Sequence, residues 1–171
     1  MTVLGLLVLR LVVGSVMAAH GSQKLFGAWS GPGLQSWTSA LASMRFRPAA
    51  ILAWTSALAE FVGGMAVFFG LLFPFSALAI IAVLVVAIIT VHIPKGFFAA
   101  KGGIEFPFVL AAAALALSLA GPGAWSLDWL LGIQFPEPAG WLVGAGAIII
   151  GLSATFAMRA KPSRPPVSQK A

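Results

Sequence analysis

The sequence predicts an all-α integral membrane protein: a helical bundle of four spans plus a fifth transmembrane helix. Hydrophobic residues make up 60% of the 171 residues and charged residues only 8%, whereas a water-soluble domain carries about 25% charged residues. Five apolar runs fill most of the chain, each close to the ~20 residues with which a helix crosses ~30 Å of hydrocarbon. They are roughly residues 3–20, 49–72, 75–92, 104–120 and 139–158. Because the runs are continuous and not alternating, they indicate helices and not a transmembrane barrel.

The basic residues fall in alternate gaps between these runs. Five spans put the 21–48 loop, the 93–103 loop and the residues after 158 on one side, together with nine of the ten Lys and Arg. The positive-inside rule then predicts that this side is cytoplasmic and that the N-terminus lies outside. The net charge of +6 is therefore expected to face anionic lipid headgroups, and no nucleic-acid partner is expected.

The polar segments between the spans have their own patterns. Residues 33–47 place four apolar side chains at helical spacing, which predicts a short helix on the inner membrane surface; an irregular loop is the alternative. The four are Leu34, Trp37, Leu41 and Met44. Residues 121–138 form a Trp-rich loop that is expected to lie along the outer interface. Residues 159–171 are basic and rich in proline and are expected to be a disordered cytoplasmic tail.

Small residues recur inside the spans, as in Gly14-x-x-x-Ala18, Gly63-Gly64 and Gly140-x-x-x-Gly144. Such spacings allow helices to approach closely in lipid. Internal packing is expected here in preference to a dimer face.

Two ionisable residues interrupt the apolar runs at similar predicted depth. Arg10 lies about 10 Å below the outer end of the first run, and Glu60 lies about 16 Å from the inner end of the second, at 1.5 Å per residue. Ionisable groups at membrane depth are costly and need a partner or a purpose. We therefore expect Arg10 and Glu60 to form an intramembrane ion pair, which could serve structure or function.

A second polar group is expected near the inner interface, where His20, Lys24, His92 and Glu105 lie at the ends of different spans. Histidine with a nearby carboxylate and lysine can bind a quinone head group and exchange its protons. Each residue also has a structural reading, such as snorkelling of lysine or a helix-end hydrogen bond. Neither histidine lies in a haem motif, so haem is not expected. Two histidines with scattered carboxylates predict no metal site, and the absence of cysteine excludes thiolate chemistry.

These residues also resemble the signature of the DoxX family. The resemblance is carried by Arg10-Leu11, Gly14, the run His20-Gly21-Ser22-Gln23-Lys24-Leu25-Phe26-Gly27, Glu60 with Gly63-Gly64, His92 before Phe97-Phe98, and Glu105-Phe106. It covers residues 1–120, in the order and spacing of the family. The candidate residues for binding a ligand or quinone are His20, Gln23, Lys24, Glu60, His92 and Glu105. It implies a four-span bundle over 1–120, so that the 121–138 loop, the 139–158 helix and the 159–171 tail are additions.

The resemblance implies a multi-pass protein of a bacterial cell (inner) membrane. Some DoxX proteins belong to respiratory or sulfur redox chains, including a thiosulfate:quinone oxidoreductase, and others to oxidative-stress complexes; no catalytic residue set is secure for the family. We therefore expect an accessory subunit of a membrane redox complex, with protein partners and a quinone-interacting polar cluster, and not an enzyme on its own. The alternatives are a scaffold subunit without its own chemistry and a small transporter or proton pathway.

Overall fold

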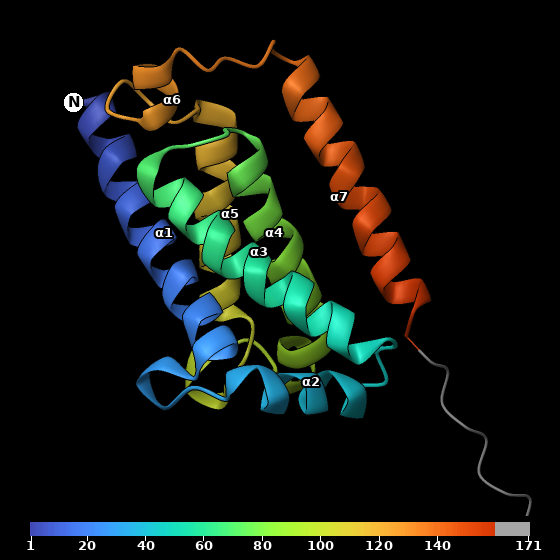
Figure 1. The fold of residues 1–171 in the computed structure, drawn as a ribbon. Coiled ribbons are helices and arrows are strands. Elements are labelled where there is room, and N and C mark those ends of the chain that lie inside the picture. Colours follow the sequence, from blue (N-terminus) through green and yellow to red (C-terminus); the bar gives the residue numbers. More distant parts are fainter. Residues whose placement is uncertain (160–171) are drawn as a thin grey trace, which may run out of the picture.

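Four helical segments of the computed structural model are long and apolar enough to cross a membrane (Figure 1). They are α1 (Thr2–Phe26), α3 (Ala49–Phe69), the segment Phe75–Lys95 that begins with α4 (Phe75–Ala87), and α7 (Ala139–Ala157). The shorter apolar helix α5 (Glu105–Ala120) has 16 residues, about 24 Å at 1.5 Å per residue. The predicted all-α membrane fold is confirmed. The structure describes residues 1–159, so all of the predicted tail except Arg159 lies outside the described residues.

The first helix is longer than the sequence pattern predicted. The apolar run ends at His20, but α1 continues to Phe26, and its C-cap residue Gly27 has a left-handed φ of 69°. Glycine adopts this conformation without a Cβ penalty and commonly closes helices. As a result Lys24 lies on the last turn of α1 and not in a loop, which decides its partner.

The third apolar run changes its helical form towards its end. α4 is α-helical to Ala87, and the π-helical turn η2 (Ile88–His92) and the 3₁₀ turn η3 (Ile93–Lys95) follow it. Pro94 has no backbone N–H and cannot continue an α-helix, so the chain leaves the bundle here. The next loop contains the short turn η4 (Ala99–Lys101) and leads into α5.

Glycines bring α1 and α3 into backbone contact. A Cβ on Gly14 would collide with the backbone of Phe68, and a Cβ on Gly64 would collide with the backbone of Ala18. In lipid, such close approach replaces the hydrophobic effect as the source of helix association. The prediction that these small residues serve internal packing is therefore confirmed for the α1–α3 pair.

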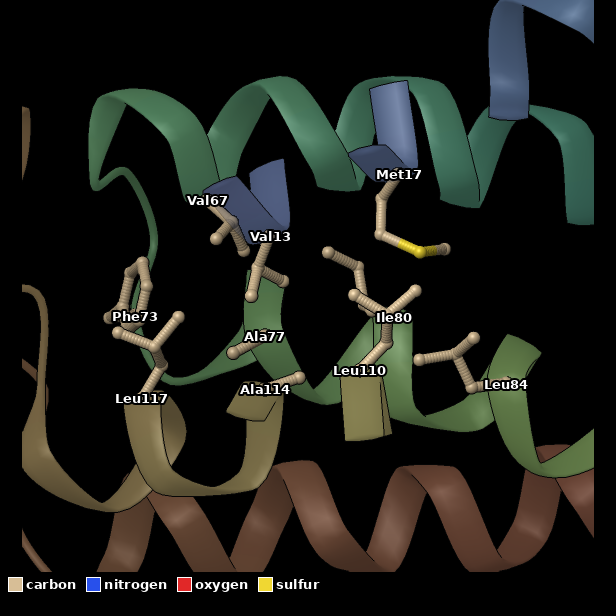
Figure 2. Packing of buried hydrophobic residues seen from close by; sticks show 10 residues of the cluster. All are labelled: Val13, Met17, Val67, Phe73, Ala77, Ile80, Leu84, Leu110, Ala114 and Leu117. Carbon is tan, nitrogen blue, oxygen red and sulfur yellow. The ribbon is translucent and has the colours of Figure 1, made fainter. Parts of the chain in front are cut away.

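The apolar core lies between α1, α3, α4 and α5. Figure 2 shows ten buried side chains of this core, which interdigitate across the bundle axis. They are Val13, Met17, Val67, Phe73, Ala77, Ile80, Leu84, Leu110, Ala114 and Leu117. None of the ten belongs to α7, so the four helices form a packed unit to which α7 is added.

Two short helices mark the two ends of this bundle. α2 (Gly33–Ser43) lies across one end, which we call the α2 end. α6 (Leu127–Leu131) lies at the other end, near the N-terminus, which we call the α6 end. The helix predicted over residues 33–47 is thus present, although it stops at Ser43.

α7 stands apart from the four packed helices and contacts them mainly through α4 (Figure 1). Near the α6 end, a Cβ on Gly144 would meet Leu78 and Phe75, so α7 approaches α4 closely there. At the α2 end, Arg159 Nε donates to the Met44 carbonyl at 3.1 Å, and Arg47 N–H donates to the Met158 carbonyl at 3.1 Å. α7 is therefore held near both ends, while its middle faces the bundle across wider space.

Candidate functional site

The ion pair of the bundle joins Lys24 of α1 to Glu60 of α3. Lys24 Nζ lies 2.5 Å from Glu60 Oε1, and the side chains of the two residues are 17% and 5% exposed. Lys24 reaches Glu60 because α1 extends to Phe26 and runs antiparallel to α3, with Gly21 packed against Phe61. The pair neutralises Glu60, whose charge would otherwise be costly at this depth.

The predicted pairing of Arg10 with Glu60 is wrong. Arg10 Nη2 donates to the Trp125 carbonyl at 2.5 Å, in the same 121–138 segment that carries Asp128. Arg10 and Lys24 are separated by about 21 Å along α1, at 1.5 Å per residue, so one carboxylate cannot serve both. The prediction assumed that the outer ends of the first two runs lie at the same level, whereas Gly14 lies against Phe68 and Gly21 against Phe61, which places Glu60 opposite the last turns of α1.

A buried polar cluster at the α6 end was missed by sequence reasoning. Asp128 is 3% exposed and accepts hydrogen bonds from the backbone N–H groups of Leu72 and Phe73, both at 2.8 Å. It thereby fixes the turn between α3 and α4 and brings the 121–138 loop onto Arg10. The sequence feature that could have indicated this cluster is Asp128, the single aspartate of the 121–138 loop. This loop is predicted to lie on the outer side of the membrane, and Arg10 lies in the outer part of the first span.

A cavity of about 470 Å³ lies between α7 and the face of the bundle formed by α2, α3 and α4; we call it the α4–α7 cavity. Its wall is mainly apolar, and the side chains from α4 and α7 are mostly small. The α4 and α7 residues that line it include Ala79, Ala82, Val83, Val86, Gly144, Ala147, Gly151 and Leu152. Ligand sites in proteins commonly enclose about 300–1,000 Å³ with mostly apolar walls and a few polar groups.

Several polar groups of this cavity lie around the ion pair, while Thr90 of η2 and Thr155 of α7 also line it. Lys24 and Glu60 both line it, together with Trp37 of α2 and Ser56 of α3. Trp37 Nε1 donates to Ser56 Oγ at 2.9 Å, and Lys24 Nζ lies 4.2 Å from the centre of the Trp37 ring. Glu60 Oε2 is buried and has no hydrogen-bond partner among the described residues. The cavity thus has a polar end and a long apolar wall.

His20 and Gln23 lie on α1 outside this cavity. His20 is exposed; its Nδ1 donates to the Val16 carbonyl at 2.9 Å, and its ring stacks on Phe106 with centroids 5.9 Å apart. Gln23 packs through its Cβ and backbone against Gly31. Neither residue lines the α4–α7 cavity, so their place in a ligand site stays a prediction without geometric support.

His92 and Glu105 close the loop between η2 and α5. His92 Nδ1 donates to the Gly102 carbonyl at 2.7 Å, and Glu105 Oε2 accepts from the Ala99 backbone N–H at 2.7 Å. Both bonds lie within the 92–105 segment. The predicted convergence of all candidates on one polar layer is therefore only partial, since the cavity gathers Lys24 and Glu60 alone.

Metal chemistry has little support in this geometry. Within residues 1–159, no three His, Asp or Glu side chains come close enough together to hold a metal ion. What the site offers is a cation, a carboxylate, a hydroxyl and an aromatic face beside an apolar wall. These groups can orient a hydrogen-bonding head group that carries a hydrocarbon chain.

Comparison with known families matches residues 5–93 to the DoxX family. The match spans α1, α2, α3, α4 and η2, and it contains both residues of the ion pair. α7 lies beyond the matched segment. No curated protein and no solved structure matches the chain significantly.

Proposed function

This chain belongs to the DoxX family of multi-pass membrane proteins, and from that premise we propose that it is an accessory subunit of a membrane redox complex that binds a quinone. The polar end of the α4–α7 cavity holds the quinone head group, and the apolar wall holds its chain. The single observation that carries this proposal is the Lys24–Glu60 pair, which lines the polar end of a mainly apolar cavity.

The chemistry of a quinone head matches the groups at this end of the cavity. Its oxygen atoms can accept from Lys24 Nζ, and the Trp37 ring provides an aromatic face beside them. Lys24 and Glu60 are opposite in charge and nearly cancel, which suits a ligand head that is itself neutral. Without an evident metal or flavin site among its described residues, the chain would not itself carry electrons, so electron transfer falls to partner subunits.

We propose that the protein lies in a bacterial cell membrane with its N-terminus outside and the α2 end facing the cytoplasm. The charges support this orientation, because Arg45, Arg47, Lys95 and Lys101 follow α2 or α4 towards the α2 end, whereas the α6 end has no Lys or Arg in its loops. Reporter fusions at the 121–138 loop and at residues 96–103 test it. Alkaline phosphatase activity is expected only from the 121–138 fusion, and the reverse result would overturn the orientation.

A structural role is the second candidate, and a specific observation favours it. Several of the predicted site residues form hydrogen bonds to the backbone of the protein itself. His92 and Glu105 close a loop, and Arg10 binds the 121–138 segment. In that case the polar groups lock the bundle and the chain serves as a scaffold for partner subunits. A proton pathway through Arg10 and Glu60 loses its support, because the two residues do not pair.

The experiment that tests the proposal is purification of the full chain in a mild detergent, followed by mass spectrometry of the bound lipids and proteins. About one quinone per chain, lost in Glu60→Gln but kept in Glu137→Gln, is the expected result. Glu137 is an exposed carboxylate at the α6 end and makes a matched control. Phospholipid alone in the wild-type preparation would refute the quinone site and leave the scaffold role.

A further inference from the structure

We propose that the ligand of the α4–α7 cavity enters and leaves sideways, from the hydrocarbon layer, through the space between α3 and α7. This inference rests on the proposed function, because it gives the entry route of the same site. It also defines the class of ligand, since a molecule dissolved in the membrane reaches the site and a water-soluble one does not. Three features of the cavity support this route: closure towards the α6 end, closure towards the α2 end and an open side opposite α4.

Towards the α6 end, direct contact of α7 with α4 closes the cavity. Gly144 is buried in α7, and a Cβ added to it would collide with Leu78 and lie 3.2 Å from Phe75. Phe75 also packs edge-to-face against Phe135 of the preceding loop, with ring centroids 4.9 Å apart. Close-packed contacts of this kind leave no room for a hydrocarbon chain. A ligand therefore cannot pass along α7 from the α6 end.

Towards the α2 end, aromatic side chains and the attachment of α7 close the cavity. Phe46 is buried and lines this end, and the guanidinium carbon of Arg159 lies 5.5 Å from the centre of its ring. Phe46 and Arg159 are also paired in an isolated antiparallel β-bridge. Trp37 of α2 lines the same end and is fixed by its hydrogen bond to Ser56. A polar molecule would have to leave water and cross this wall, which is costly.

The side of the cavity opposite α4 is open. The described residues do not enclose the cavity, and its lining comes mainly from α3, α4 and α7. α4 packs against both α3 and α7, whereas α7 contacts the bundle mainly through α4 (Figure 1). α4 is therefore the floor of a groove whose walls are α3 and α7. Thr55 of α3 and Gly151 of α7 line these walls and are exposed. Because both walls are membrane-spanning helices, the groove opens into the hydrocarbon layer.

This open side determines which molecules reach the polar end at Lys24 and Glu60. Each CH₂ group favours transfer from water into an apolar layer by about 0.8 kcal/mol, so a molecule with a hydrocarbon chain is concentrated in the membrane beside the groove. Its head group can move along the groove while its chain stays in apolar surroundings. A head group without a chain stays in the water and meets the closed α2 end.

Exchange of bound decylubiquinone for its deuterated form tests the route. The full chain is reconstituted in phosphatidylcholine vesicles with decylubiquinone, and mass spectrometry follows the replacement after deuterated decylubiquinone is added. Thr55→Trp places an indole at the open side and is expected to slow the exchange several-fold. The Thr55 hydroxyl donates to the Leu52 carbonyl at 3.2 Å, within α3, so its loss removes no contact between helices. Leu58→Trp, at an exposed residue of α3 that does not line the cavity, is the control. Equal exchange rates in Thr55→Trp and Leu58→Trp would overturn the inference.

A reversible disulfide tests the competing route through the α2 end. The chain has no cysteine, and facing residues of an antiparallel bridge have Cα atoms about 4.5–5.5 Å apart, within reach of a disulfide. The double variant Phe46→Cys/Arg159→Cys therefore fixes α7 to the segment before α3 when it is oxidised. Its reduced form, freed of reductant, is the matched control.

The oxidised and reduced forms of this double variant are expected to exchange decylubiquinone at equal rates. Slower exchange in the oxidised form would show that the ligand passes the α2 end, which would overturn the inference while leaving a quinone site in place. If the wild-type chain binds no decylubiquinone at all, the proposed function fails and this inference fails with it.

Discussion

Arg10 and Lys24 lie on one face of α1, yet they bind partners at different ends of the bundle. Arg10 donates to the Trp125 carbonyl at the α6 end, and Lys24 pairs with Glu60 in the α4–α7 cavity. Met17 lies between them on the same face and is 2% exposed within the apolar core. The bundle thus has two separate polar layers with packed side chains between them.

The Lys24–Glu60 pair is expected to stabilise the bundle as a unit. Lys24→Met leaves Glu60 buried without its cation, which we expect to cost roughly 3 kcal/mol of stability. The double variant Lys24→Met/Glu60→Met removes both charges and should recover most of that loss. The measurement is thermal unfolding of the detergent-purified variants. Lys101→Met, at an exposed lysine, is the matched control, and equal loss in single and double variants would contradict the pairing.

Asp128 is expected to be the main polar support of the α6 end. Asp128→Asn leaves one side-chain acceptor where two backbone N–H groups now bind. We expect a loss of about 2 kcal/mol, typical for hydrogen bonds to charged groups. Glu137→Gln, at an exposed carboxylate of the same loop, should leave the melting temperature unchanged. Equal melting temperatures for Asp128→Asn and Glu137→Gln would show that Asp128 does not stabilise the α6 end.

Gly70 directly follows α3 and lies beside the Arg10 side chain, and it is expected to tolerate no side chain of its own. It has a φ of 68°, and an added Cβ would collide with the Arg10 guanidinium and with Ser126. Gly132 has a φ of 67° with no atom near an added Cβ. Gly132→Ala therefore measures only the backbone strain, about 1 kcal/mol, and Gly70→Ala should cost distinctly more. Chemical or thermal unfolding of the two variants compares them directly.

α7 is expected to control retention of the hydrocarbon chain in the α4–α7 cavity. Gly151 lines this cavity, and an added Cβ meets open space there. Gly151→Leu should therefore fill part of the cavity and lower the amount of co-purified quinone several-fold with little change in stability. Gly146 also has open space at its Cβ but does not line the cavity, so Gly146→Leu is the control. An unchanged quinone content in Gly151→Leu would show that the hydrocarbon chain of the quinone does not lie beside Gly151.

Much of the secondary structure follows from local pattern. The starts of α3, α4 and α7 fall where the apolar runs begin, and α2 begins at the predicted residue Gly33. The end of α1 was missed because polar residues from His20 onward were read as the membrane boundary. In the structure Gly21 is buried against Phe61, and only the left-handed Gly27 stops the helix.

The candidate site was predicted in its components but not in its pairing. Lys24 and Glu60 were both selected as polar residues near or within apolar runs, but Glu60 was assigned to Arg10. Trp37 was predicted on the apolar face of a short helix, without its hydrogen bond to Ser56. Asp128 was not predicted to have a structural role, because only the tryptophans of its loop were used to predict where the loop lies.

The sequence alone determined that this chain is a membrane-spanning helical protein of the DoxX type, because span length, charge and signature residues are local properties that lipid enforces directly. Only the tertiary structure decided which charges meet and where a cavity remains. The antiparallel register of α1 and α3 is set by backbone contact at Gly14 and Gly64, and the space beside α4 is set by how far α7 stands from it. Both depend on distances between segments that are far apart in the sequence, and no local pattern encodes such distances.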